Sequence, residues 1–222
     1  MGLILNIDTS TETASVSIAR EGAILSFTTN NVQKEHASFL HLAIKDLLQH
    51  ASVNFKQLDA IAITEGPGSY TGLRVGMATA KGLSYALNKP FITVETLAAM
   101  ALAAATKNKN FTNYYCPMID ARRMEVYTAL YDHEMIEILP ACAIVLTDTS
   151  FLKELKDNKI TFSGSGIQKW KAIINNNNCI FLDEINITLS IAQLSEKKFS
   201  EKKFKELANS QPLYVKEFYT GN

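Results

Sequence analysis

Residues 59–74, DAIAITEGPGSYTGLR, join an apolar run to a glycine-rich turn and to the first turn of a helix. The run at 59–64 predicts a strand, and the spacing of apolar residues predicts a helix over about 71–87. Such a turn lets backbones approach closely and leaves helix N–H groups facing outward, where an anion can bind. The residues of the turn are Gly66, Pro67, Gly68, Ser69 and Thr71. No Gly-Lys-Ser/Thr follows, and the spacing G-x-G-x-x-x-G is not that of a dinucleotide fingerprint, so neither a P-loop nor an NAD site is predicted.

The chain on either side of this turn alternates between strand and helix patterns. The first residues form an almost continuous apolar run, typical of a central strand buried on both faces, and an alternating hairpin pattern follows. The expected elements are strands at 3–8, 14–19, 23–28, 59–64 and 90–94 and helices at 34–51, 71–87 and 95–106. The first half therefore has the order βββαβαβα.

A weaker version of the same order follows the polar break at 106–110. Its first strand ends in Ile119-Asp120, as the first strand of the chain ends in Ile7-Asp8. The expected elements are strands at 114–120, 125–131, 135–139, 160–163 and 180–182 and helices at 148–155, 167–174 and 188–208. We interpret this as two matched α/β domains, 1–106 and 107–222, with the last residues packing back on the first domain. Chance similarity of two mixed halves is the alternative.

Composition and charge restrict the class of protein. The chain has 222 residues, 47% of them hydrophobic, with 22 Lys and Arg against 22 Asp and Glu. The longest apolar run, 97–105, is far shorter than the roughly 20 residues of a membrane span, and no targeting segment is recognised, so a cytoplasmic protein is expected. Three separated cysteines argue against a disulfide framework. Zero net charge indicates that a partner would carry any RNA.

The helix at 71–87 has two faces of small residues. Gly72, Gly76 and Ala80 lie on one side, and Ala78, Gly82 and Ala86 lie on another. An interior glycine costs roughly 1 kcal/mol relative to alanine, so close packing must offset about 2 kcal/mol. Either both faces pack inside this chain, or a partner helix covers one of them. In the helix at 34–51, Leu42 lies outside the apolar stripe, as a lone exposed leucine or as part of a second apolar surface.

Six short segments together resemble the bacterial TsaB (YeaZ) family across nearly the whole chain. They are Ile7-Asp8-Thr9-Ser10-Thr11-Glu12, Glu35-His36, the turn from Gly66 to Arg74, Thr96-Leu97-Ala98, Ile119-Asp120-Ala121-Arg122 with Glu125-Val126-Tyr127, and Pro212-Leu213-Tyr214-Val215-Lys216. The sequence departs from the family pattern at His41-Leu42, where members often have Leu-Pro, and at Lys216, where Arg is usual.

The resemblance implies two ribonuclease-H-like domains of the actin-like, sugar-kinase-like ATPase fold. It also implies a non-catalytic subunit that binds the TsaD threonylcarbamoyl transferase and works with the TsaE ATPase. The complex forms threonylcarbamoyladenosine beside the anticodon of tRNAs that read codons beginning with A. The expected partners are therefore TsaD and TsaE, a second copy when the chain is alone, and tRNA through the complex.

The family joins its partner through the helix pair that corresponds to 34–51 and 71–87. The residues expected at this interface are His36, Leu40, Ala43, Leu47, Gly72, Arg74, Gly76 and Ala80. Leucine at Gly76 or Ala80 is accordingly expected to weaken association while the monomer stays folded.

The chain is expected to hold neither nucleotide nor metal itself, with ATP or ADP and metal on the partner subunits. Actin-like ATPases bind phosphate on glycine-containing loops after the first strand of each domain. Here the matching loops begin at Asp8 with Ser10 and at Asp120 with Arg122, and neither contains glycine. His36 and His41 diverge by about 140° on a helix, which disfavours a shared metal. The turn at 163–166 keeps glycines that could touch a nucleotide, and a free-standing small-molecule kinase or ATPase of the same fold is the alternative function.

Overall fold

The computed structural model describes residues 2–32, 36–108 and 112–216, apart from the His36 side chain, and divides into two units. The first unit comprises Met1–Thr96 and Ile187–Leu213, and the second comprises Leu97–Asn186 and Tyr214–Asn222. Each unit contains one five-stranded mixed sheet.

The first sheet has the strand order β3-β2-β1-β4-β5, with β1 in the centre. β1 pairs antiparallel with β2 and parallel with β4, as expected for a hairpin followed by a crossover helix. The elements are β1 (Leu3–Asp8), β2 (Ala14–Arg20), β3 (Ala23–Asn30), α1 (His36–His50), a 3-10 helix at Phe55–Gln57, β4 (Ala60–Gly66), α2 (Tyr70–Leu87) and β5 (Phe91–Glu95).

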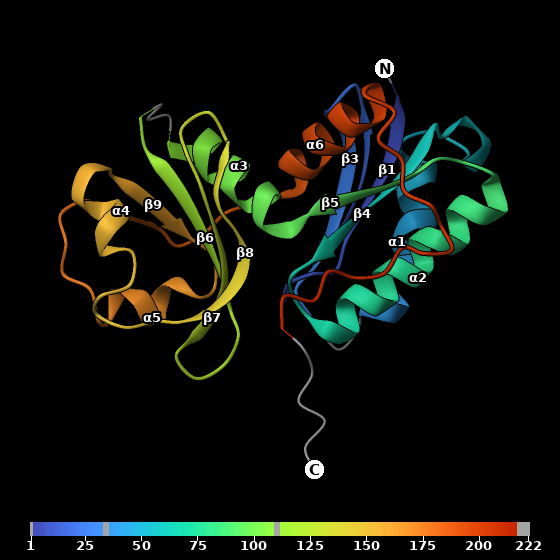
Figure 1. Cartoon of the computed structure of the whole chain (residues 1–222). Helices are drawn as coiled ribbons and strands as arrows, with labels where there is room; N and C mark the ends of the chain where they lie inside the picture. Colours follow the sequence, from blue (N-terminus) through green and yellow to red (C-terminus); the bar gives the residue numbers. More distant parts are fainter. Residues whose placement is uncertain (1, 33–35, 109–111, 217–222) are drawn as a thin grey trace, which may run out of the picture. The chain divides into compact units, whose positions relative to one another are not determined.

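Helices cover both faces of this sheet, which explains why β1 is buried throughout. Figure 1 shows α1 and α2 on one face and α6 (Thr188–Ser200) on the other. Leu5 and Ile7 of β1 point toward α1 and α2 in the core, whereas Asn6 faces α6 and accepts a 2.6 Å hydrogen bond from the Ser195 hydroxyl. The alternation of side chains along the strand sends neighbouring residues to opposite faces.

The second sheet has the order β10-β9-β6-β7-β8. Read from β8 to β10, the second sheet has the strand order of the first, with β6 in the place of β1. Its core is built around Trp170, Phe162 and Phe151, whose ring centroids lie 5.8 Å apart. The elements are α3 (Thr96–Asn108), β6 (Tyr114–Asp120), β7 (Glu125–Tyr131), β8 (Glu137–Val145), α4 (Leu152–Asp157), β9 (Ile160–Ser163), α5 (Ile167–Lys171) and β10 (Cys179–Leu182). The shared order confirms the expected α/β fold of two ribonuclease-H-like units.

The division between the units differs from the expected boundary at residue 106. α3 packs in the second unit, where the Asn108 amide donates a 2.8 Å hydrogen bond to Thr161 Oγ1. Residues 187–213 pack in the first unit, where the Lys205 N–H donates to the Phe91 carbonyl at 2.8 Å and the Leu213 N–H donates to the Glu65 carbonyl at 2.6 Å. These long-range backbone contacts leave no local signal in the sequence.

The two largest differences in length from the sequence expectation are in α6 and β8. α6 ends at Ser200 rather than at 208 because Lys202 adopts a left-handed conformation with φ of 55°. The N–H groups of Lys202 and Lys203 then donate to the carbonyls of Phe199 and Lys198, which is a Schellman motif. β8 continues beyond 139 to Val145, because Pro140 lies on the edge strand at a register shift, where its missing N–H breaks no ladder.

Among the described residues, the structure contains no helix both long and apolar enough to cross a membrane.

Candidate functional site

The loop after β1 is held inside the first unit by its own side chains. Asp8 is 2% exposed, and one of its carboxylate oxygens, Oδ1, accepts three hydrogen bonds. The donors are the Ser10 N–H at 2.9 Å, the Ser10 hydroxyl at 2.6 Å and the Thr64 hydroxyl at 2.7 Å. Donors from the same chain therefore occupy this carboxylate oxygen.

The glycine-rich turn packs against this loop. The Ser69 N–H donates to the Ser10 carbonyl at 2.7 Å, and the Thr9 hydroxyl donates to the Gly72 carbonyl at 2.7 Å. A Cβ built at Gly68 or Gly72 would lie under 3.0 Å from a carbonyl oxygen of the loop, at Ser10 and Thr9 respectively. The glycines of the turn allow the chain to approach itself, and Thr9 and Ser10 have no exposed surface.

The first small face of α2, where the sequence analysis expects a partner contact, packs against residues of its own unit instead. A Cβ at Gly76 would lie under 3.0 Å from both Thr9 Oγ1 and Ile63 Cδ1, so glycine is needed inside the unit. Six of the eight residues expected at the interface are buried in the first unit, namely Leu40, Ala43, Leu47, Gly72, Gly76 and Ala80. Arg74 alone is described as exposed, and the His36 side chain lies outside the described part of the structure.

The second small face of α2 is exposed. Ala78, Gly82 and Ala86 all lie at the surface, and a Cβ built at Gly82 meets no atom within 4 Å. Tyr85 beside them is 82% exposed, and the Arg74 guanidinium lies 4.0 Å from the centre of the Tyr70 ring. The outer surface of α2 thus combines small side chains with a large aromatic and a cation.

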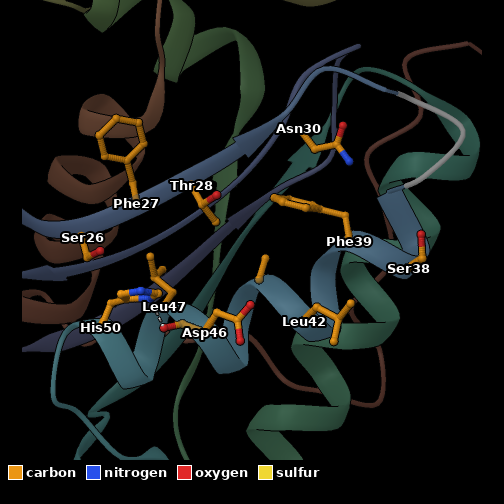
Figure 2. Close-up of a pocket in the computed structure, with 11 residues that line it drawn as sticks. Ser26, Phe27, Thr28, Asn30, Ser38, Phe39, Leu42, Asp46, Leu47 and His50 are labelled. Atoms are coloured by element: carbon orange, nitrogen blue, oxygen red, sulfur yellow. Dashed lines mark hydrogen bonds between the residues drawn. The ribbon is translucent and has the colours of Figure 1, made fainter.

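A groove of about 630 Å³ lies between the edge strand β3 and α1. Figure 2 shows Phe39, Leu42 and Leu47 projecting from α1 along it, while Phe27 points to the other face of the sheet. His50 Nδ1 lies 2.7 Å from the Asp46 carbonyl at one end. Leu42 is 64% exposed on its rim, outside the buried apolar stripe of this helix.

The second candidate loop, after β6, is stabilised by lysine. Lys169 Nζ lies 2.9 Å from Asp120 Oδ1 and donates to the Glu125 carbonyl at 3.0 Å. Partial burial raises the pKa of Asp120, but the hydrogen bonds from Lys169 and from the Arg122 N–H outweigh it and hold that pKa below the ordinary value. Arg122 and Arg123 both adopt left-handed conformations, with φ of 69° and 47°. This loop therefore exposes arginine side chains where an actin-like ATPase has small residues.

The sequence analysis missed Thr64 and Lys169, which donate hydrogen bonds to Asp8 and Asp120 respectively. Thr64 could have been found, because its hydroxyl stands at the end of a buried strand next to the glycine-rich turn. No pattern in the sequence indicates Lys169, because 49 positions separate it from Asp120.

Three other features bear on whether the described residues could hold a metal, a nucleophile or a nucleotide. Within the described residues, no group of three His, Cys, Asp or Glu side chains is arranged to hold a metal ion. Burial raises the pKa of the Cys116 thiol to about 12, so this thiol is not an activated nucleophile. In the turn at 163–166, the Ser165 hydroxyl accepts the Asp120 N–H at 3.0 Å, and a Cβ at Gly164 would lie under 3.0 Å from the Met118 carbonyl oxygen.

Two mixed five-stranded sheets with one shared strand order define an α/β protein of two matched units, in agreement with the actin-like, sugar-kinase-like class that the resemblance implies. The profile of the family described as "TsaD: tRNA N6-adenosine threonylcarbamoyltransferase" matches residues 25–214. A Bacillus subtilis relative, tRNA threonylcarbamoyladenosine biosynthesis protein TsaB, is 30% identical over 77% of this chain and 74% of its own length. The Escherichia coli protein of the same name is 34% identical over 59% of this chain, and the match spans 55% of that relative.

The structural comparison agrees. A crystal structure from Pseudomonas aeruginosa, described as similar to peptidase YEAZ, superimposes with a TM-score of 0.84 at 25% identity over 97% of this chain and 100% of that one. The chain belongs to the TsaB (YeaZ) family, whose curated members are named for tRNA threonylcarbamoyladenosine biosynthesis.

Proposed function

We propose that the chain is a non-catalytic scaffold subunit that binds the TsaD transferase and, together with the TsaE ATPase, supports threonylcarbamoyladenosine formation on tRNA. Its relatives are named as tRNA threonylcarbamoyladenosine biosynthesis proteins. The observation that carries the non-catalytic role is the loop at Asp8. Its carboxylate binds the chain's own donors, and Thr9 and Ser10 are buried under the glycine turn.

ATP or ADP and metal belong, in this proposal, to the partner subunits. Phosphate binding after β1 requires free backbone N–H groups at close approach. In this chain the Ser10 N–H donates to Asp8, and the Ser69 N–H donates to the Ser10 carbonyl. A free-standing kinase or ATPase would have to open both contacts before a nucleotide could bind.

The outer surface of α2, together with the rim of the groove on α1, is the proposed partner interface. Gly82 supports it, because an exposed interior glycine costs roughly 1 kcal/mol relative to alanine and nothing inside this unit requires it. A helix that packs closely on Ala78 and Gly82 would make glycine favourable there. Exposed Tyr85 supplies an aromatic side chain of the kind enriched at interfaces, and exposed Leu42 adds apolar surface. A second copy would use the same surface, and tight binding of tRNA would require the assembled complex.

Complex formation with the transferase, followed by mass measurement, tests the proposal. We expect a stable complex of the wild-type chain and weaker binding for Gly82→Leu. A bulky side chain at a close contact typically costs 1 to 3 kcal/mol, or roughly 5- to 150-fold in affinity.

Two variants serve as controls. Gly82→Ala keeps the surface small and should keep most of the affinity, and Gln193→Leu adds the same side chain to an exposed position of α6. Normal binding by a folded Gly82→Leu chain would exclude this interface, and the absence of any complex with the wild-type chain would refute the scaffold role.

A further inference from the structure

The hairpin between β6 and β7 carries two neighbouring arginine side chains. Arg122 and Arg123 are exposed, and no ion pair within the described residues includes either guanidinium. The two acids at the base of the same hairpin are already paired. Lys169 binds Asp120 at 2.9 Å, and Lys216 binds Glu125 at 2.7 Å. The acids are thus neutralised, and the hairpin presents the two arginine charges.

The backbone holds these arginines in place. The Ala121 N–H donates to the Glu125 carbonyl at 3.1 Å, and the Glu125 N–H donates to the Arg122 carbonyl at 3.0 Å. The Arg122 N–H donates to Asp120 Oδ1 at 2.6 Å, so both ends of the turn are tied to the sheet. Two successive non-glycine residues in the left-handed region are uncommon, and such conformations persist when the surrounding structure enforces them. The backbone of the hairpin therefore holds the two neighbouring arginine residues in a fixed conformation.

We propose that Arg122 and Arg123 bind the phosphodiester backbone of tRNA, which adds an RNA contact on the second unit to the scaffold role proposed above, on which this inference rests. Guanidinium groups match phosphate oxygens in charge and geometry, and phosphate contacts supply most of the sequence-independent affinity for nucleic acid.

An extended polyanion fits the site better than a free nucleotide. The arginines project from an exposed hairpin, whereas small ligands bind in concave sites that bury most of their surface. The grooves of about 630 and 430 Å³ are both lined by residues of the first unit only. A backbone that passes over the hairpin needs no enclosed cavity. In a chain of zero net charge, two such contacts contribute to binding without making the protein a strong RNA binder alone.

The first experiment uses the full chain alone with a tRNA transcript at low salt, where the Debye length reaches about 30 Å at ~0.01 M. We expect weak binding of tRNA by the wild-type chain. The double variant Arg122→Gln/Arg123→Gln should bind tRNA with an affinity lower by about fivefold or more. The control Lys153→Gln/Lys156→Gln removes two exposed charges from α4 of the same unit and should bind like the wild type.

The second experiment measures tRNA binding by the chain assembled with the transferase, as a function of salt. Loss of two phosphate contacts should reduce the slope of log K against log salt by about 1.5. The double variant Arg122→Lys/Arg123→Lys should restore the wild-type slope. The slope depends on the number of phosphates that cationic side chains neutralise, and lysine keeps the charge. Unchanged affinity and slope in the Gln variant, or equal losses in the α4 control, would overturn the inference.

The outcomes separate this inference from the scaffold role. If the wild-type chain fails to assemble with the transferase, the scaffold role fails, while the measurement on the chain alone still decides the RNA contact. If the Gln variant loses assembly instead of tRNA binding, the arginines contact protein and the inference is wrong. Binding of ATP by the chain alone that is lost in the Gln variant would assign the arginines to a nucleotide and also overturn it.

Discussion

Two glycines on α2 provide a sharp test of the packing, because the same substitution should have opposite effects. At Gly82 no atom lies within 4 Å of an added Cβ, so Gly82→Ala should raise the free energy of unfolding by about 1 kcal/mol through helix propensity. At Gly76 the added Cβ would lie under 3.0 Å from Thr9 Oγ1 and Ile63 Cδ1. Thr9 would have to move, although its hydroxyl donates to the Gly72 carbonyl at 2.7 Å in a fully buried site.

The expected cost at Gly76 follows from those contacts. Overpacking costs about 1–3 kcal/mol, and a buried group that loses its partner costs about 1–3 kcal/mol more. Subtracting the propensity gain of about 1 kcal/mol leaves Gly76→Ala destabilised by about 1–5 kcal/mol.

Urea unfolding followed by far-UV circular dichroism gives both values. Trp170, the single tryptophan, lies in the second unit, so its fluorescence provides a separate probe. A larger shift by circular dichroism than by fluorescence would place the damage in the first unit. A Gly76→Ala chain at least as stable as the wild type would refute the packing of Thr9 against α2. Destabilisation of Gly82→Ala would show that the outer face of α2 is packed within this chain.

Three further predictions follow from the loops and the helix end. Calorimetry of the isolated chain with Mg-ATP should detect no micromolar binding, because Asp8 and Ser10 already bind the chain's own donors; a micromolar dissociation constant would contradict this. Lys202→Gly should raise the free energy of unfolding by up to about 1 kcal/mol, since the residue has φ of 55°, whereas Ser200→Gly inside α6 should lower it. The stabilisation from Asp120 and Lys169 is present above the ordinary pKa of aspartate, 3.8, and is lost as pH falls through the lowered pKa of Asp120. The difference in urea midpoint between the wild type and Lys169→Met should therefore shrink from about pH 5 toward pH 2, and a difference independent of pH would count against the pair.

Local patterns in the sequence were sufficient for the element order and the family. Three patterns of apolar side chains can be recognised within a few residues: the run at 3–8, the hairpin alternation and the helical stripe at 34–51. Each follows from the directions in which successive side chains of a strand or a helix point. The duplicated order and the turn from Gly66 to Arg74 then identified the fold class and the family, and the strand orders and relatives agree. The absence of glycine in the Asp8 loop was also visible in the sequence.

Which small face of α2 is buried was decided only by the tertiary structure. Gly76 and Gly82 have equivalent local sequence signals, yet Gly76 lies against Thr9, 67 positions earlier in the chain, whereas nothing in this unit covers Gly82. The same is true of the Lys169 contact with Asp120 and of α6, which the sequence expectation placed in the second domain and which packs in the first unit. Periodicity shows which sides of a helix carry small or apolar residues. It does not show which of those sides the rest of the chain will cover, because burial depends on contacts with residues many tens of positions away in the sequence.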